Sequence, residues 1–126
     1  MKLKLNYLAI VEAASDDYDM LEIINSDMNA LELYVQSVYT MEVTIPVVRA
    51  RYEGEEVRDR ITALDRNRRA AHERAIIAVK RLNRFSGILG VSPLFEGDVN
   101  DRYQIADFCH KAVSEIFSDR CGVLNK

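Results

Sequence analysis

The chain of 126 residues contains no tryptophan, two prolines, five glycines and two cysteines. So little proline and glycine excludes collagen-like and low-complexity chains. Two cysteines are too few for a small disulfide-stabilised scaffold, and no apolar run approaches the roughly 18 residues that a membrane-spanning helix needs. With 48% hydrophobic and 29% charged residues, residues 1–126 are predicted to form a single globular domain that buries its own core.

The cysteines and the N-terminus predict a cytoplasmic protein. Cys109 and Cys121 fall on or just beyond one predicted helix, where a separation of twelve residues corresponds to about 18 Å, too far for a disulfide. We interpret both as reduced thiols, which favours the cytoplasm. The N-terminus starts with positive charge and continues to small residues, as a signal peptide does, but Asn6 and Glu12 confine its apolar run. Export is therefore not expected.

Charge is distributed unevenly along the chain. The net charge is −3, which excludes the strongly basic proteins that bind nucleic acid with their whole surface. Residues 1–57 hold 4 basic and 11 acidic residues, residues 58–84 hold 9 and 3, and residues 85–126 hold 4 and 6. A basic segment inside an acidic protein can serve internal packing, dimerisation or an acidic partner.

Residues 27–52 carry the clearest helical pattern. Apolar residues recur every three or four positions, as on one face of a helix: Leu31, Tyr34, Val38, Met41, Ile45, Val48 and Tyr52. Asp27 is the predicted N-cap, and Gly54 lies just beyond the end. Pro46 predicts a kink, because it removes a backbone hydrogen bond. The β-branched run at residues 43–48 is an alternative strand, but the unbroken stripe favours a helix.

A second long helix is predicted over residues 55–86. Its apolar stripe consists of Val57, Ile61, Leu64, Ala71, Ala75, Val79 and Leu82. The short link at residues 53–55 makes the two helices an antiparallel hairpin. Gly87, Gly90 and Pro93 mark the loop that follows.

Shorter helices complete the prediction, over about residues 100–118, 5–14 and 16–25. The predicted N-caps are Asp98 or Asn100 for the C-terminal helix and Ser15 or Asp16 for the helix at 16–25. The apolar alternation at residues 3–7 leaves a short strand as an alternative. The predicted fold class is all-α: a helical bundle built on a long antiparallel hairpin, with a C-terminal helix and shorter N-terminal helices.

The predicted hairpin is too long for a small compact domain. A straight helix over residues 55–86 is about 48 Å long, whereas a domain of this size has a radius of gyration of about 14 Å. Part of the hairpin must therefore project past its own core. Either the N-terminal helices or a second copy covers its apolar stripe, and we favour a symmetric homodimer.

The basic segment forms one face of the second long helix. Its residues span an arc of about 120° opposite the apolar stripe: Arg66, Arg69, Lys80, Arg81 and Arg84. Such a face fits an acidic protein surface or a phosphate backbone. The alternative is a solvated face, because Asp59 and Glu73 interrupt the arc and Arg69 is expected to pair with Glu73. Ile77 also points into the arc, which favours a contact surface.

A second polar cluster lies on the apolar stripe itself. Arg68 occupies a core position and therefore requires a carboxylate, for which Asp65 is the local candidate and Asp107 the distant one. The candidate polar pocket consists of Asp65, Arg68, His72, Asp107 and His110, and Asn83 edges the same stripe. Three interpretations remain: an ion-pair network that sets helix register, a small-anion pocket on Arg68 and His72, or a metal site. Di-iron and zinc-protease ligand patterns are absent, so no metal and no cofactor is expected.

No catalytic motif stands in the chain. There is no Gly-x-Ser-x-Gly elbow and no glycine-rich phosphate loop. Cys109 and His110 are adjacent on a helix and point apart, which makes Cys109 a small core residue. The acidic loop at residues 91–101 lacks the alternating oxygen ligands of a calcium loop and is interpreted as a helix-capping loop.

The run from Tyr52 to Phe108 resembles a known family. The resemblance rests on Glu53-Gly54-Glu55, Asp65-Arg66-Asn67-Arg68-Arg69-Ala70-Ala71-His72, Leu82-Asn83-Arg84, Asp98-Val99-Asn100-Asp101-Arg102 and Ala106-Asp107-Phe108, with Ile45-Pro46 before them. These segments are similar to those of an uncharacterised bacterial family of small helical proteins, a domain of unknown function. The resemblance covers about half of the chain and implies a bacterial, cytosolic and helical protein, and it transfers no activity.

These patterns favour a non-enzymatic, homodimeric helical module for interaction or regulation, with the basic helix face as its contact surface for an acidic protein or nucleic acid. The alternative is a protein that binds a small anion or a metal, with a hydrolytic role, at the candidate polar pocket. DNA binding through a helix-turn-helix is weaker, because the predicted helices are too long. No membrane partner is expected.

Overall fold

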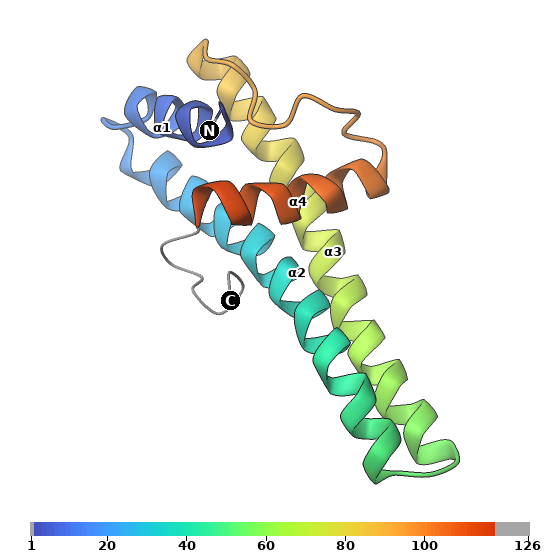
Figure 1. Ribbon diagram of the computed structural model, residues 1–126. Helices are drawn as coiled ribbons and strands as arrows, with labels where there is room; N and C mark the ends of the chain where they lie inside the picture. The colour runs from blue at the N-terminus through green and yellow to red at the C-terminus, as the bar shows by residue number, and fades with distance from the viewer. Residues whose placement is uncertain (1, 118–126) are drawn as a thin grey trace.

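The computed structural model describes residues 2–117, which form four α-helices and no strand. Helix α1 spans Lys2–Ala13, α2 spans Tyr18–Arg51, α3 spans Glu55–Leu89 and α4 spans Arg102–Ile116. Helices α2 and α3 form an antiparallel hairpin, and α4 crosses them near the end where α1 lies (Figure 1). The predicted all-α class and hairpin are therefore confirmed. None of the helices in this range is long and apolar enough to cross a membrane.

Helix α2 is one continuous helix where the sequence predicted two. Its N-cap is Asp17, whose side chain accepts a hydrogen bond from the Met20 backbone N–H at 3.0 Å. The caps predicted at Ser15 or Asp16, and at Asp27, are therefore wrong. Asp27 is buried inside the helix instead, where its carboxylate is bound to a side chain of α3 rather than to backbone N–H groups.

Neither of the alternative strands forms. Helix α2 continues through Pro46, so the strand at residues 43–48 is wrong, and residues 3–7 belong to α1. Pro46 is exposed, which lets water reach the carbonyl group that the proline leaves without its helical partner.

Two glycines mark the ends of α3. Gly54 in the turn has φ +62° and Gly90 after the helix has φ +73°, backbone conformations that favour glycine because it has no Cβ. Gly90 ends α3 at Leu89, beyond the predicted residue 86, so Gly87 lies inside the helix and not in the loop.

Helix α4 is capped by a residue that the sequence analysis did not select. The Asp101 carboxylate accepts hydrogen bonds from the backbone N–H groups of Tyr103 at 3.0 Å and Gln104 at 3.2 Å. The predicted caps, Asp98 and Asn100, are wrong. They lie in the preceding loop, where the Asp98 carboxylate accepts from the Asn100 backbone N–H at 2.9 Å.

Asn83 ties this loop to α3. Its side-chain amide donates to the Phe95 carbonyl at 2.8 Å, and its side-chain oxygen accepts from the Phe95 backbone N–H at 3.1 Å. Both polar atoms of the Asn83 side-chain amide thus form hydrogen bonds with the backbone of one residue, Phe95. Asn83 therefore positions the chain between α3 and α4, and it does not line a pocket with Arg68.

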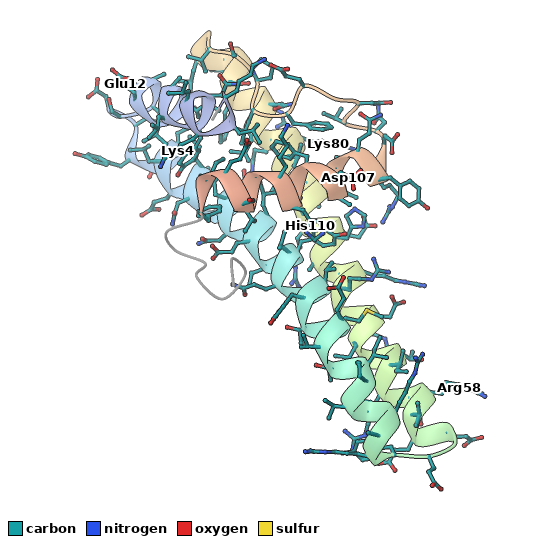
Figure 2. All side chains as sticks on the ribbon, in the orientation of Figure 1. Lys4, Glu12, Arg58, Lys80, Asp107 and His110 are labelled. Carbon is teal, nitrogen blue, oxygen red and sulfur yellow. The ribbon has the colours of Figure 1, made fainter. Side chains whose placement is uncertain are left out.

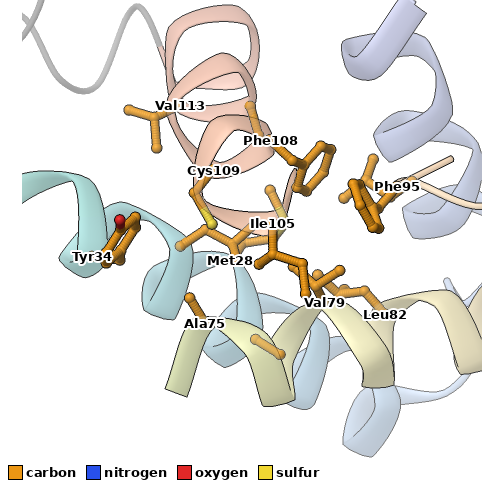
Figure 3. Packing of buried hydrophobic residues seen from close by; sticks show 14 of the residues in the cluster. Met28, Tyr34, Ala75, Val79, Leu82, Phe95, Ile105, Phe108, Cys109 and Val113 are labelled. Carbon is orange, nitrogen blue, oxygen red and sulfur yellow. The ribbon is translucent and has the colours of Figure 1, made fainter. Parts of the chain in front are cut away.

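The core lies where α1 and α4 pack against the hairpin. Its fully buried members come from all four helices and include Ile10, Ile24, Met28, Leu31, Ala75, Val79, Leu82, Ile105, Cys109 and Ala112 (Figure 3). Burial raises the pKa of the Cys109 thiol to about 12, so Cys109 is a core residue and not a thiolate nucleophile at neutral pH. Cys121 lies outside the described residues.

The outer half of the hairpin projects beyond this core (Figure 1), as the sequence predicted. We call residues 39–67 the arm. Tyr39 and Glu42 at its base border a cavity that α4 also lines, and beyond them no other helix of the described range runs beside the arm. Val48 is buried between the two helices, whereas Met41, Ile45 and Ile61 are only half-buried, because two helices alone cannot enclose their shared side chains.

One buried ion pair joins the two long helices inside the core. Asp27 is 2% exposed, and its carboxylate accepts hydrogen bonds from Nε of Arg81 at 2.8 Å and Nη2 at 2.5 Å. The hydrogen bonds that Arg81 donates to the Asp27 carboxylate raise the pKa of Arg81. The two residues are 54 positions apart and equidistant from Gly54 in the turn. The pair therefore matches the antiparallel register that the turn imposes.

Replacing Arg81 is expected to destabilise the protein more than replacing Asp27. Arg81→Met leaves a buried carboxylate without a partner, with a loss of about 2–4 kcal/mol. Asp27→Asn leaves Arg81, whose side chain is 39% exposed, able to reach water, with a loss of about 1–2 kcal/mol. Urea unfolding followed by circular dichroism measures both losses. The matched control, Arg84→Met on the exposed side of α3, should change stability by less than about 0.5 kcal/mol. A smaller loss for Arg81→Met than for Asp27→Asn contradicts the prediction.

Candidate functional site

Part of the predicted basic face of α3 is exposed in the structure. Arg66, Lys80 and Arg84 are exposed and form no ion pair with any residue of the described range. Ile77, on the same side of the helix, is 59% exposed. These four residues form a positive surface with an apolar centre, which we call the basic face (Lys80 is labelled in Figure 2).

The other two residues predicted for this face are engaged within the molecule. Arg69 pairs with Asp65, with Nε 2.8 Å from the carboxylate, so the pairing predicted with Glu73 is wrong. Arg81 reaches across to α2 and pairs with Asp27. Its guanidinium is therefore bound to a buried carboxylate of α2 and is not part of the basic face.

The five residues of the candidate polar pocket do not meet at one cavity. Arg68 and His72 line a cavity of about 480 Å³, with Asp65 bound to Arg68 beside it. Asp107 lines a separate cavity of about 360 Å³ next to α1, and His110 lines a third of about 290 Å³ between α2 and α4; both residues are labelled in Figure 2. No group of three or more His, Cys, Asp or Glu side chains in residues 2–117 is placed to hold a metal ion.

The cavity at Arg68 lies where α2, α3 and the start of α4 meet. We call it the arginine pocket, and it is lined by Tyr34, Arg68, Arg69, His72, Glu73, Arg102, Tyr103 and Ala106. Three of its eight lining residues are arginines. Three guanidinium groups in one small cavity give it a positive electrostatic character.

Arg68 has the local partner that the sequence predicted. Its Nε and Nη2 donate to one oxygen of Asp65 at 3.1 and 2.8 Å, and Arg69 binds the other oxygen. The hydrogen bonds from Arg68 lower the pKa of Asp65. Burial raises the pKa of Tyr34, and the nearby Arg68 guanidinium opposes that effect. Asp107, the distant candidate, lies at another cavity and is not the partner of Arg68.

His72 connects three helices. The ring is buried and stacks on the Tyr34 ring of α2, with the centroids 4.8 Å apart. Nε2 lies 3.1 Å from the carbonyl oxygen of Arg102 at the start of α4. A carbonyl can only accept, so Nε2 carries a proton and donates it. Tyr34 also contacts the His110 ring edge-on at 5.9 Å, so the two histidines flank one tyrosine without sharing a cavity.

Sequence reasoning missed the residues that α4 brings to the pocket. Arg102 forms an ion pair with Glu73, which lowers the pKa of Glu73, and Tyr103 is 81% exposed at the cavity. Tyr34 was assigned only to the apolar stripe. The periodicity along one helix contains no signal for these contacts, because Glu73 and Arg102 are 29 residues apart.

The arm carries a second surface that the sequence analysis did not select. On the exposed side of α2, five uncharged residues recur at helical spacing: Tyr39, Val43, Pro46, Val47 and Ala50. We call them the outer stripe. Val43 is 48% exposed. Glu42 and Arg49, which flank the outer stripe along one edge of the same helix, are also exposed. The signal was present in the spacing, but only the structure shows that, beyond Tyr39 at the cavity between α2 and α4, no helix of the described range covers the stripe.

Comparison with known proteins identifies a family but no activity. No curated protein and no solved structure shows significant similarity to the chain. A family model described as a protein of unknown function, DUF3232, matches residues 3–121. This match covers nearly the whole chain and confirms the resemblance to a domain of unknown function that the sequence suggested. The chain therefore belongs to the DUF3232 family of proteins of unknown function.

Proposed function

We propose that this protein is a non-enzymatic helical interaction module of the bacterial cytoplasm, and that it acts as a homodimer through the outer stripe of the arm. The observation that carries the proposal is an apolar, uncharged face on a projection only two helices thick. Soluble monomers rarely expose contiguous apolar faces. Two such arms packed together form a four-helix bundle that buries both outer stripes.

The residues of the outer stripe are complementary to a second copy in antiparallel orientation. A two-fold axis near residue 45 sets Val43 of one copy against Val47 of the other, and Tyr39 against Ala50, a large residue facing a small one. In an antiparallel helix pair, residues on the same edge face each other. The same axis therefore brings Glu42 of each copy close to Arg49 of the other, which places two ion pairs at the rim of the interface.

The double substitution Val43→Glu/Val47→Glu is expected to convert the dimer to a monomer, because it buries four carboxylates in the apolar centre of the interface. Light scattering coupled to size-exclusion chromatography, at about 100 μM protein, gives the molar mass. The matched control is Ile88→Glu, an exposed isoleucine at the far end of α3, which should remain dimeric. A monomeric wild-type protein, or a double variant that stays dimeric, contradicts the proposal.

Charge reversal tests the proposed orientation of the two copies. Glu42→Arg alone and Arg49→Glu alone place like charges together at two rim contacts, and each is expected to weaken the dimer about three- to tenfold. The combined variant Glu42→Arg/Arg49→Glu restores opposite charges and should recover most of the affinity. Sedimentation equilibrium measures the dissociation constants. Losses that simply add in the combined variant would exclude this register.

The basic face of α3 supports a second contact, with an acidic protein. The exposed Ile77 among Arg66, Lys80 and Arg84 is the specific observation that favours a surface for binding over one for solvation, since an apolar centre within a charged rim is typical of interfaces. In the proposed dimer the interface lies on α2, so this face of α3 remains accessible.

The triple reversal Arg66→Glu/Lys80→Glu/Arg84→Glu is expected to abolish binding to poly-glutamate, used as an acidic probe and measured by fluorescence anisotropy. The helical circular-dichroism signal should not change, because all three side chains are exposed. A control of equal charge change, Lys4→Glu/Arg51→Glu/Lys111→Glu, separates a local surface from a general effect of net charge. If both triple variants lose binding equally, the basic face is not the contact surface.

A further inference from the structure

We propose that the arginine pocket binds a small organic anion, with its carboxylate or phosphate group on the guanidiniums and its apolar body against the tyrosines. The cavity of about 480 Å³ lies in the size range of small-molecule sites, roughly 300–1,000 Å³. It is lined by side chains of α2, α3 and α4, so an occupant contacts all three helices.

The charges at the cavity do not balance. Arg68, Arg69 and Arg102 contribute three positive charges, whereas the carboxylates that bind them are those of Asp65 and Glu73. Asp65 serves two of the three guanidiniums. Among the lining residues and their ion-pair partners, positive charges therefore outnumber negative ones by one, which favours an anion in the cavity.

The three arginines are held in place but retain donors. A guanidinium has five N–H groups. Arg69 uses Nε on Asp65, and Arg102 uses Nη2 on Glu73, so both keep N–H groups for an oxyanion. The Arg69 and Arg102 side chains are 74% and 53% exposed, but each is held near the cavity by its ion pair, so binding costs somewhat less side-chain entropy than it does for freely rotating arginines.

The rest of the lining suits an apolar or aromatic body. Tyr34 is stacked on His72 and forms a fixed aromatic wall, while Tyr103 stands 81% exposed at the cavity. Ala106 adds a small apolar surface. The His72 Nε2–H is taken by the Arg102 carbonyl, so the ring serves as support for the wall and does not contact the anion through that nitrogen.

Isothermal titration calorimetry of the full-length protein tests this inference. The probes are inorganic phosphate, phenyl phosphate and benzoate, each at constant ionic strength maintained with sodium chloride. We expect phenyl phosphate or benzoate to bind in the millimolar range or tighter, and the stronger of the two identifies the preferred oxyanion. Inorganic phosphate should bind more weakly than phenyl phosphate, because it lacks the aromatic body.

Variants distinguish a built pocket from diffuse attraction. Arg69→Gln and Arg102→Gln should each weaken the binding of phenyl phosphate about tenfold or more, as expected for loss of a charged hydrogen bond. Tyr103→Ala should weaken the binding of phenyl phosphate and leave the binding of inorganic phosphate unchanged. Because Tyr103 is exposed, its replacement is not expected to disturb folding. The matched controls are Arg66→Gln and Arg84→Gln, on the same helix but outside the pocket. These controls should bind as the wild type does.

Two results overturn the inference. The first is that no probe binds the wild-type protein below about 10 mM. The second is that Arg66→Gln weakens binding as much as Arg69→Gln, which indicates general attraction to a basic surface. The inference does not depend on dimerisation, because no residue of the outer stripe lines the pocket. The monomeric Val43→Glu/Val47→Glu variant should therefore bind the probes with wild-type affinity.

Discussion

The ion pair between Asp27 and Arg81 is the contact on which the arrangement of the two long helices depends. Apolar stripes repeat every three or four residues, so two helices that slide past each other by a turn still bury apolar side chains. A buried carboxylate does not tolerate that slip, because it loses its partner. Asp27 is 2% exposed and is bound by two nitrogens of Arg81. The positive φ of Gly54 closes the same hairpin at the other end, and the two constraints agree on one register.

The pocket and the arm both follow from that register. It sets Tyr34 of α2 against His72 of α3, and the Arg102 carbonyl at the start of α4 then accepts a hydrogen bond from His72 Nε2. Helix α4 thereby brings Arg102 and Tyr103 to Arg68 and Arg69. Because α4 crosses only one end of the hairpin (Figure 1), the other end is left as a two-helix arm. The packing of α4 across one end of the hairpin thus separates a region with the arginine pocket from a region with an uncovered face.

The success of sequence reasoning at each residue depended on the distance to its partner along the chain. The pair of Arg68 with Asp65 was predicted, because three residues of a helix bring the two side chains to one face. The pair of Arg69 with Glu73 was wrong although the spacing was equally good. Arg69 has a carboxylate four residues away on either side, and Glu73 is taken by Arg102 from another helix. Asp27 was assigned as a helix cap because the sequence does not show that Arg81, 54 residues later, binds its carboxylate.

The sequence by itself determined the all-α class, the antiparallel hairpin, its projection past the core and the burial of Cys109, since these follow from local periodicity, turn residues and helix length. Only the tertiary structure decided that Asp107 and His110 face other cavities than His72, that arginines from two helices line one pocket, and that the outer stripe is uncovered. The physical reason is the range of the forces involved. A helix of 3.6 residues per turn sets which side chains share a face, but which faces meet is decided by packing between segments that lie far apart in the chain.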